Sequence, residues 1–203
     1  MVDWDYQMHT SFTDGKNSVD EMAERAAAIG LREIAITEHV REKLDYDYQK
    51  LAAEIDQAAE KYKIKIWKGV EAKILPNGKL DMPESLGLKI DLILGSVHSW
   101  PKEITIETSY RQLTASACQI IAHPNYLSDD LIKEAINFDK PIEINYRYQL
   151  PTDQLKLIGK YPKLKVSFGS DSHSVETLDK ARQYFDFVAK NFIIPSQIWK
   201  KTG

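Results

Sequence analysis

The stretch SVDEMAERAAAIGLREIAITEH, residues 18–39, decides the fold class that the sequence predicts. Ser18 and Glu21 have the spacing of a capping box, so we expect a helix to begin at this point. Gly30 is the residue type that commonly ends a helix. The apolar run Glu33–Thr37 follows and predicts a short buried strand. The stretch therefore indicates one helix and one strand of a larger repeating arrangement.

The same alternation continues along the chain. Six further short apolar strands are expected at Trp4–Met8, Ile64–Val70, Asp91–Gly95, Gln119–Ala122, Pro141–Asn145 and Leu164–Phe168. Helices are expected at Met22–Ile29, Tyr48–Tyr62, Ser109–Cys118, Ser128–Phe138, Thr152–Lys160 and Val175–Lys190. Strands that alternate with helices predict parallel pairing. One continuous series of seven strands predicts an α/β fold, a seven-stranded (β/α)7 barrel that forms a single domain over residues 1–203.

Composition excludes several classes of protein. The 203 residues carry 27 basic and 30 acidic side chains, so the net charge of −3 provides no basic footprint for nucleic acid or for an anionic membrane. The one cysteine, Cys118, excludes an internal disulfide framework and is expected to be buried. No apolar run is long enough to span a membrane, and the start MVDWDYQ is unlike a signal peptide. We therefore expect a cytoplasmic protein; the sequence leaves its oligomeric state open.

Histidines fall at or just past the ends of five expected strands. They are His9, His39, His98, His123 and His173. Acidic residues accompany them, namely Asp14, Glu38, Glu71 and Asp171. Because the carboxyl ends of barrel strands converge on one face, we expect these side chains to meet. Mixed imidazole and carboxylate donors suit zinc, manganese or iron, and such ions activate water for hydrolysis.

In order along the chain, these residues resemble the motifs of the polymerase-and-histidinol-phosphatase (PHP) superfamily. The first two motifs correspond to Asp5–Gly15 and Thr37–His39. The later motifs correspond to Gly69–Glu71, Gly95–His98, Ile121–Pro124 and Gly169–His173. The resemblance implies a distorted seven-stranded barrel with two or three divalent metal ions, zinc, manganese or iron, at the carboxyl ends of the strands.

The resemblance also implies which residues hold each ion. The first ion would take His9, Glu71 and Asp171. The second would share Glu71 and add His98 and His123. The third would use Asp14, His39 and His173. A metal-bridging hydroxide held by Glu71 and Asp171 would act as the nucleophile. Gln7 stands where the motif usually has a histidine, and we expect its amide oxygen to face the first ion as a weak ligand.

Two arginines are expected to bind the substrate phosphate, because a guanidinium group matches phosphate oxygens. Arg147 follows the sixth strand, and Arg41 follows His39; for each the competing interpretation is a surface ion pair. Lys73 is a third, weaker candidate for the phosphate. Trp100 would form a pocket wall or cap the barrel, and Asn145 and Tyr146 are expected at the same face, where the asparagine could orient a ligand.

The sequence thus predicts a metal-dependent phosphoesterase of the histidinol-phosphatase type. Its substrate would be a small phosphorylated metabolite, a phosphomonoester such as histidinol phosphate or a nucleotide.

One alternative is a 3′–5′ exonuclease-type phosphodiesterase, although the acidic balance argues against tight binding of nucleic acid. A second is a catalytically weakened metal-binding module, which Gln7 alone supports. A third, an amidohydrolase, needs the His-x-His pair that Gln7 breaks. The serine, acid and histidine in the segment 170–173 are adjacent in sequence, which is not triad geometry.

Overall fold

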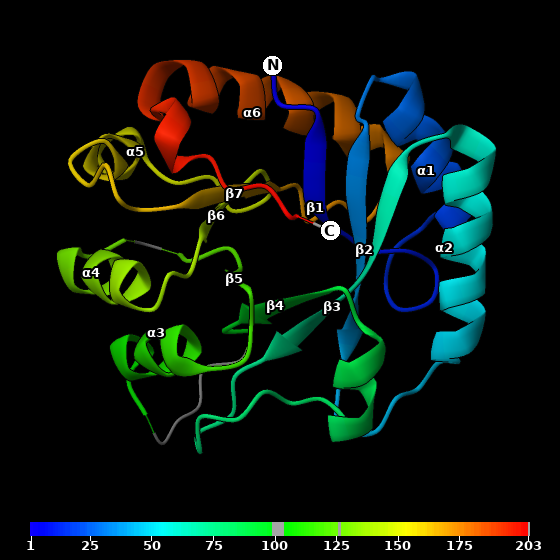
Figure 1. The fold of residues 1–203 in the computed structure, drawn as a ribbon, viewed down its shortest axis with the longest axis horizontal. Coiled ribbons are helices and arrows are strands. Elements are labelled where there is room, and N and C mark those ends of the chain that lie inside the picture. The colour runs from blue at the N-terminus through cyan, green and yellow to red at the C-terminus, as the bar shows by residue number, and fades with distance from the viewer. Residues whose placement is uncertain (99–103, 126, 203) are drawn as a thin grey trace.

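The computed structural model of the chain describes residues 1–98, 104–125 and 127–202. Its seven strands hydrogen-bond in chain order, each parallel to the next (Figure 1). They are β1 (Trp4–Met8), β2 (Glu33–Val40), β3 (Lys65–Lys73), β4 (Leu92–Ser96), β5 (Ile120–Ile121), β6 (Ile142–Asn145) and β7 (Val166–Gly169). The predicted parallel α/β architecture is therefore confirmed.

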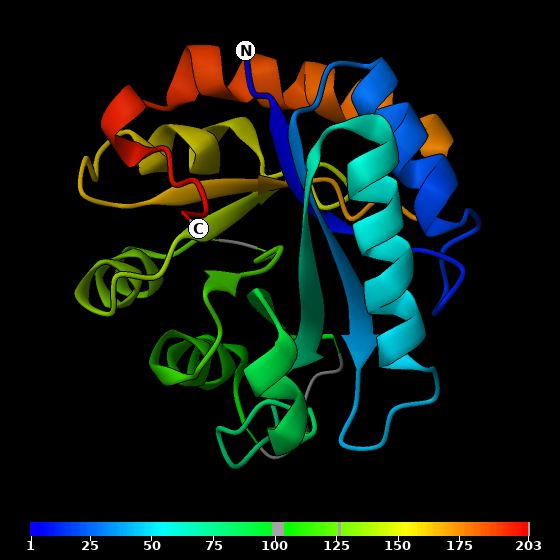
Figure 2. The same cartoon turned by 45° about the vertical axis from the view of Figure 1, so that its right-hand side comes forward.

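Helices surround the strands on the outside of the barrel (Figure 2). They are α1 (Val19–Ala28), α2 (Tyr48–Tyr62), α3 (Ile106–Ala115), α4 (Asp129–Asn137), α5 (Thr152–Ile158) and α6 (Leu178–Phe192). Short 3₁₀ turns are η1 (Glu84–Lys89), η2 (Val175–Thr177) and η3 (Pro195–Gln197). None of the helices within the described ranges has the length and apolar character needed to cross a membrane.

Backbone hydrogen bonds just past the ends of β1 and β7 bring the first and last strands together. The amide of His9 donates to the carbonyl of Ser172 at 2.9 Å, and the amide of Asp171 donates to the carbonyl of Gln7 at 2.9 Å. These contacts nearly close the sheet into the expected seven-stranded barrel. They also fix the two segments that carry His9 and Asp171 side by side.

The amino ends of the strands are filled by a buried polar cluster around Glu33. The Glu33 carboxylate accepts hydrogen bonds from the Tyr6 hydroxyl at 2.5 Å and from the Trp67 indole at 2.6 Å. The Lys200 ammonium lies 3.1 Å from the same carboxylate. Because a buried carboxylate needs such partners, this cluster stabilises one end of the barrel. The histidines lie at the opposite end.

Local capping moves one helix away from its predicted position. We expected a helix over Ser109–Cys118, but α3 begins three residues earlier because the Thr105 side chain accepts from the amide of Thr108 and caps the helix. The helix ends before Ser116, whose backbone is extended. Cys118 lies after the helix and is buried, as predicted. The last helix differs in the opposite direction: α6 begins at Leu178, after the turn η2, and so later than the expected Val175.

Candidate metal centre

Glu71, in β3, lies at the centre of the site. Its side chain is fully buried, and its Oε1 lies 2.5 Å from His98 Nε2 and 2.7 Å from His123 Nε2. Its Oε2 lies 3.3 Å from His9 Nε2 and 3.5 Å from His39 Nδ1. Strands β1 to β5 each deliver one of these side chains at or just past their carboxyl ends. One carboxylate therefore joins imidazoles from four other strands.

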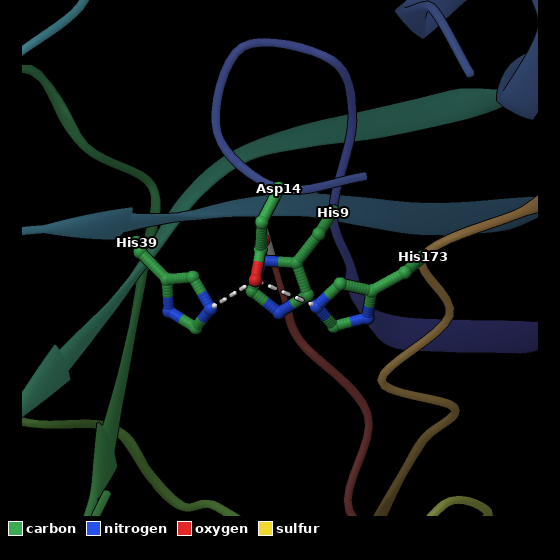
Figure 3. A group of neighbouring side chains, drawn as sticks. All are labelled: His9, Asp14, His39 and His173. Atoms are coloured by element: carbon green, nitrogen blue, oxygen red, sulfur yellow. Dashed lines mark ion pairs between the residues drawn. The ribbon is translucent and has the colours of Figure 1, made fainter. Parts of the chain in front are cut away.

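A second part of the site forms around Asp14 (Figure 3). Asp14 Oδ2 lies 3.3 Å from His173 Nε2 and 3.6 Å from His39 Nε2. The ring of His9 lies between the two, with centroid distances of 4.3 Å to His39 and 4.5 Å to His173. Asp171 also joins His9 and His173. Its Oδ1 lies 3.1 Å from His9 Nε2 and 3.7 Å from His173 Nδ1.

Glu38 positions the loop that carries Asp14. This buried carboxylate accepts from the Thr10 amide at 2.8 Å and from the hydroxyls of Thr10 and Thr13. Gly15 closes the loop, because a Cβ at this position would lie only 2.4 Å from the His9 carbonyl oxygen. The loop therefore requires glycine at this position, and Glu38 acts on the site through the loop.

Two candidate ligands adopt backbone conformations that are rare for residues with a side chain. His123 has a φ of 28° and Asp171 a φ of 53°, both in the left-handed region. Each lies two residues past the end of its strand. Such strain is concentrated at functional sites, because the surrounding contacts must hold it in place.

Several buried atoms of this cluster have no hydrogen-bond partner within the described residues. They are His9 Nδ1 and Nε2, His39 Nδ1, Glu71 Oε2 and Asp171 Oδ1. Three sets of side chains each bring one potential ligand atom per residue to within 4.8 Å of the others. The sets are His9, Asp14, His39 and His173; His39, Glu71 and His98; and His9, Glu71 and Asp171. This donor chemistry fits divalent metal ions of the zinc, manganese or iron kind.

The charges of the cluster also suit a cation. Burial would raise the pKa of Glu71, but the imidazoles of His123, His9 and His98 hold that pKa well below its ordinary value. Burial likewise opposes charge on His9 and His123, yet the adjacent carboxylates raise the pKa of His9 to about 10 and of His123 to about 9. Burial and the neighbouring His9 lower the pKa of His39 to about 4. Glu71 therefore keeps a negative charge that a metal ion could neutralise.

Gln7 lies in β1 on the same barrel face as His9, as the strand alternation predicts, and it is buried. Its Oε1 accepts from Asn145 Nδ2 at 2.9 Å, while its Nε2 has no partner within the described residues. Asn145 Nδ2 also donates to Glu143 Oε2 at 2.9 Å, and Glu143 Oε2 accepts from the His123 amide at 2.8 Å. The Gln7 oxygen thus belongs to a polar network that reaches a candidate ligand.

Glu143 was absent from the site that the sequence predicted. It is fully buried, and burial raises its pKa to about 8 although His123 opposes that change. The sequence could have indicated Glu143 through one feature: it stands two residues before the candidate Asn145, and residues two apart in a strand lie on the same face. Asp5 was also given no role, yet its buried carboxylate accepts from the Ser170 amide at 2.8 Å and supports the segment before Asp171.

The expected phosphate-binding residues lie in different surroundings. Arg147 Nη1 lies 3.5 Å from Asp171 Oδ2 and 2.9 Å from His173 Nδ1, and the side chain is half exposed. It lines a cavity of about 210 Å³ together with Tyr146. Arg41 is exposed and donates to the Val40 carbonyl at 2.9 Å. Lys73 pairs with Asp81 at 3.4 Å, and Trp100 lies outside the described residues.

Comparison with known proteins places the chain in a family. The model of the PHP domain matches residues 5–194, nearly the whole chain and every motif described above. The chain belongs to the PHP domain family. The chain is 32% identical over 199 residues to the DNA polymerase/3′-5′ exonuclease PolX of Bacillus subtilis, a match that covers 86% of this chain and 35% of PolX. The chain therefore spans about a third of the length of that relative.

Another relative matches along most of its own length. A "Probable phosphatase" of Syntrophotalea carbinolica is 26% identical over 209 residues, which cover 92% of this chain and 86% of that protein. Among solved structures, the "putative histidinol phosphatase hisK" of Listeria monocytogenes superimposes with a TM-score of 0.65 at 15% identity and covers 90% of this chain and 99% of that one. At this identity the superposition shows a shared fold.

Proposed function

We propose that this PHP domain is a metal-dependent phosphatase that hydrolyses a small phosphomonoester, such as histidinol phosphate or a nucleotide. The observation that carries the proposal is the convergence of five histidines, Asp14 and Asp171 around the buried Glu71, where several buried nitrogen and oxygen atoms have no hydrogen bond within the described residues. The family is one of PHP-like metal-dependent phosphoesterases, and a relative of similar length bears the name phosphatase, which supports the same class of reaction.

In this proposal each part of the cluster has a separate task. Glu71 and Asp171, together with the histidines and Asp14, would hold two or three divalent ions. When bound, these ions would supply an activated water and positive charge for the phosphoryl group. Arg147, beside Asp171 at the edge of the cavity, would orient the phosphate oxygens. Glu38 and Asp5 would hold the loops in place.

Metal content and chelation test the proposal. Protein purified without added metal is expected to contain divalent ions by elemental analysis, and to hydrolyse members of a phosphomonoester panel with manganese, zinc or iron. Exhaustive chelation should abolish hydrolysis, because the nucleophile depends on the metal, and adding the metal back should restore it. Full hydrolysis by protein with no residual metal would contradict the proposal.

The similarity to PolX supports a second candidate, a 3′–5′ exonuclease. A single-stranded oligonucleotide and a phosphomonoester, assayed side by side with the same metal, separate the two activities. An exonuclease should lose activity steeply between low and moderate salt, because contacts with several phosphates release counterions. A phosphatase acting on one phosphate group should show little of this dependence. The net charge of −3 favours the second result.

Arg147→Ala is expected to weaken recognition of the phosphate without removing metal. Loss of a charge-assisted hydrogen bond should cost about 1.5–3 kcal/mol, or roughly 10–150-fold in kcat/KM. Kinetics across the ester panel and metal analysis of the same samples measure both effects. Arg25→Ala is the matched control, since Arg25 forms an exposed ion pair with Asp179 on the helical surface. Wild-type kinetics in the Arg147 variant would favour a surface ion pair.

A further inference from the structure

Tyr148 lies at the edge of the candidate metal centre with much of its ring free. Its side chain is one of the large apolar groups that the structure leaves exposed, at 42%. Among these groups in the described residues, Tyr148 is the one whose ring contacts a candidate ligand: its centroid lies 5.0 Å from that of His123. Since His123 Nε2 is 2.7 Å from Glu71, a single imidazole separates Tyr148 from the central carboxylate.

The backbone fixes Tyr148 in this place. Its amide donates to Asn145 Oδ1 at 3.0 Å, and Asn145 is buried and bonded to Glu143 and Gln7. The residue therefore follows the last strand residue of β6 on a short segment anchored in the barrel. Because the backbone at Tyr148 is anchored, the chain loses less freedom there when a ligand packs on the ring, which favours binding.

Arg147 and Tyr148 present two different chemistries side by side. The guanidinium carbon of Arg147 lies 5.8 Å from the centre of the Tyr148 ring, and its Nη1 lies 3.5 Å from Asp171. A phosphate held between Arg147 and the cluster would therefore place its ester group within reach of the exposed ring. The face of an aromatic ring stacks on other planar groups, largely whatever substituents those groups carry.

We propose that Tyr148 is a specificity-determining residue that stacks on a planar, aromatic ring carried by the esterified group of the phosphate ester. This inference rests on the proposed phosphatase function and narrows its substrate class to esters whose esterified group carries an aromatic or heteroaromatic ring, in preference to esters of purely aliphatic alcohols or of sugars without such a ring.

The test compares two esters of matched ring size, phenyl phosphate and cyclohexyl phosphate, hydrolysed by the metal-loaded protein. Because phenol is also the better leaving group, the change of the ratio between variants, and not its wild-type value, measures stacking. Wild type should favour the phenyl ester in kcat/KM. In Tyr148→Leu, which keeps apolar bulk but removes the ring, the phenyl-to-cyclohexyl ratio should fall about tenfold. Tyr148→Phe should keep the wild-type ratio to within about twofold, because the ring remains. Phe187→Leu, at an exposed aromatic residue of α6, is the matched control and should not change the ratio.

Binding provides a readout that does not need turnover. Phenylphosphonate and cyclohexylphosphonate, which are not hydrolysed, are titrated into the same four metal-loaded proteins, and the ratio of dissociation constants should follow the same order. An unchanged ratio in Tyr148→Leu, or no binding of either phosphonate, would overturn the stacking proposal. Hydrolysis of neither ester, nor of any member of the phosphomonoester panel, by wild type would overturn the phosphatase function, while the phosphonate ratio would still decide the role of Tyr148.

Discussion

Replacing Glu71 by glutamine should lower turnover at least about a thousandfold, because it removes the charge at the centre of the cluster while keeping the shape of the side chain. Four imidazoles lie within 3.5 Å of this carboxylate. The variant should also lose metal, since a neutral amide is a poorer ligand than a carboxylate for divalent ions. Asp171→Ala and His123→Ala should act in the same direction.

Metal per chain by elemental analysis, together with kcat at saturating added metal, measures this effect. Glu60→Gln, at an exposed position of α2, is the matched control and should change neither quantity. Circular dichroism of each variant separates loss of the site from loss of the fold. A folded Glu71→Gln protein with wild-type metal content and turnover would show that the cluster is not the catalytic centre.

The fold could be predicted because its signals are local. Alternating apolar strands and capped helices are visible in short stretches, and the strand β1 and the helix α2 lie where they were expected. The position of the histidines at strand ends then needed only one topological rule, that parallel strands end on the same face. The shift of α3 arose from a capping threonine, Thr105, whose side-chain hydrogen bond the apolar pattern does not reveal.

The polar network beneath the site could not be predicted in the same way. Gln7 and Asn145 are 138 positions apart in sequence, and their hydrogen bond depends on the barrel being nearly closed. Glu143 lies inside the barrel because of the alternation of β6, a strand of only four residues with too short a pattern to assign a face by itself. Closeness in sequence can also mislead. Arg41 is two residues from His39, which joins the cluster, but the Arg41 guanidinium donates to the backbone carbonyl of Val40.

Gln7→His should restore the histidine that the PHP motif usually has, and should increase metal binding. An imidazole nitrogen is a better donor than an amide oxygen to borderline divalent ions, so the metal concentration for half-maximal activity should fall about tenfold. The first position should bind more weakly than the others in wild type, or prefer a harder ion such as manganese. Gln57→His, at an exposed position of α2, controls for adventitious binding by an added histidine.

The network around Gln7 makes this prediction sharper. The Gln7 oxygen already accepts from Asn145, so an amide that also ligated an ion would have to share that oxygen or give up the hydrogen bond. If it keeps the bond, wild type should bind fewer ions than Gln7→His, as measured by metal per chain after gel filtration. Three tightly held ions in wild type, with neither occupancy nor rate changed by Gln7→His, would refute the weakened position. Hydrolysis gained only in Gln7→His would instead identify the wild-type chain as a metal-binding module that has lost turnover.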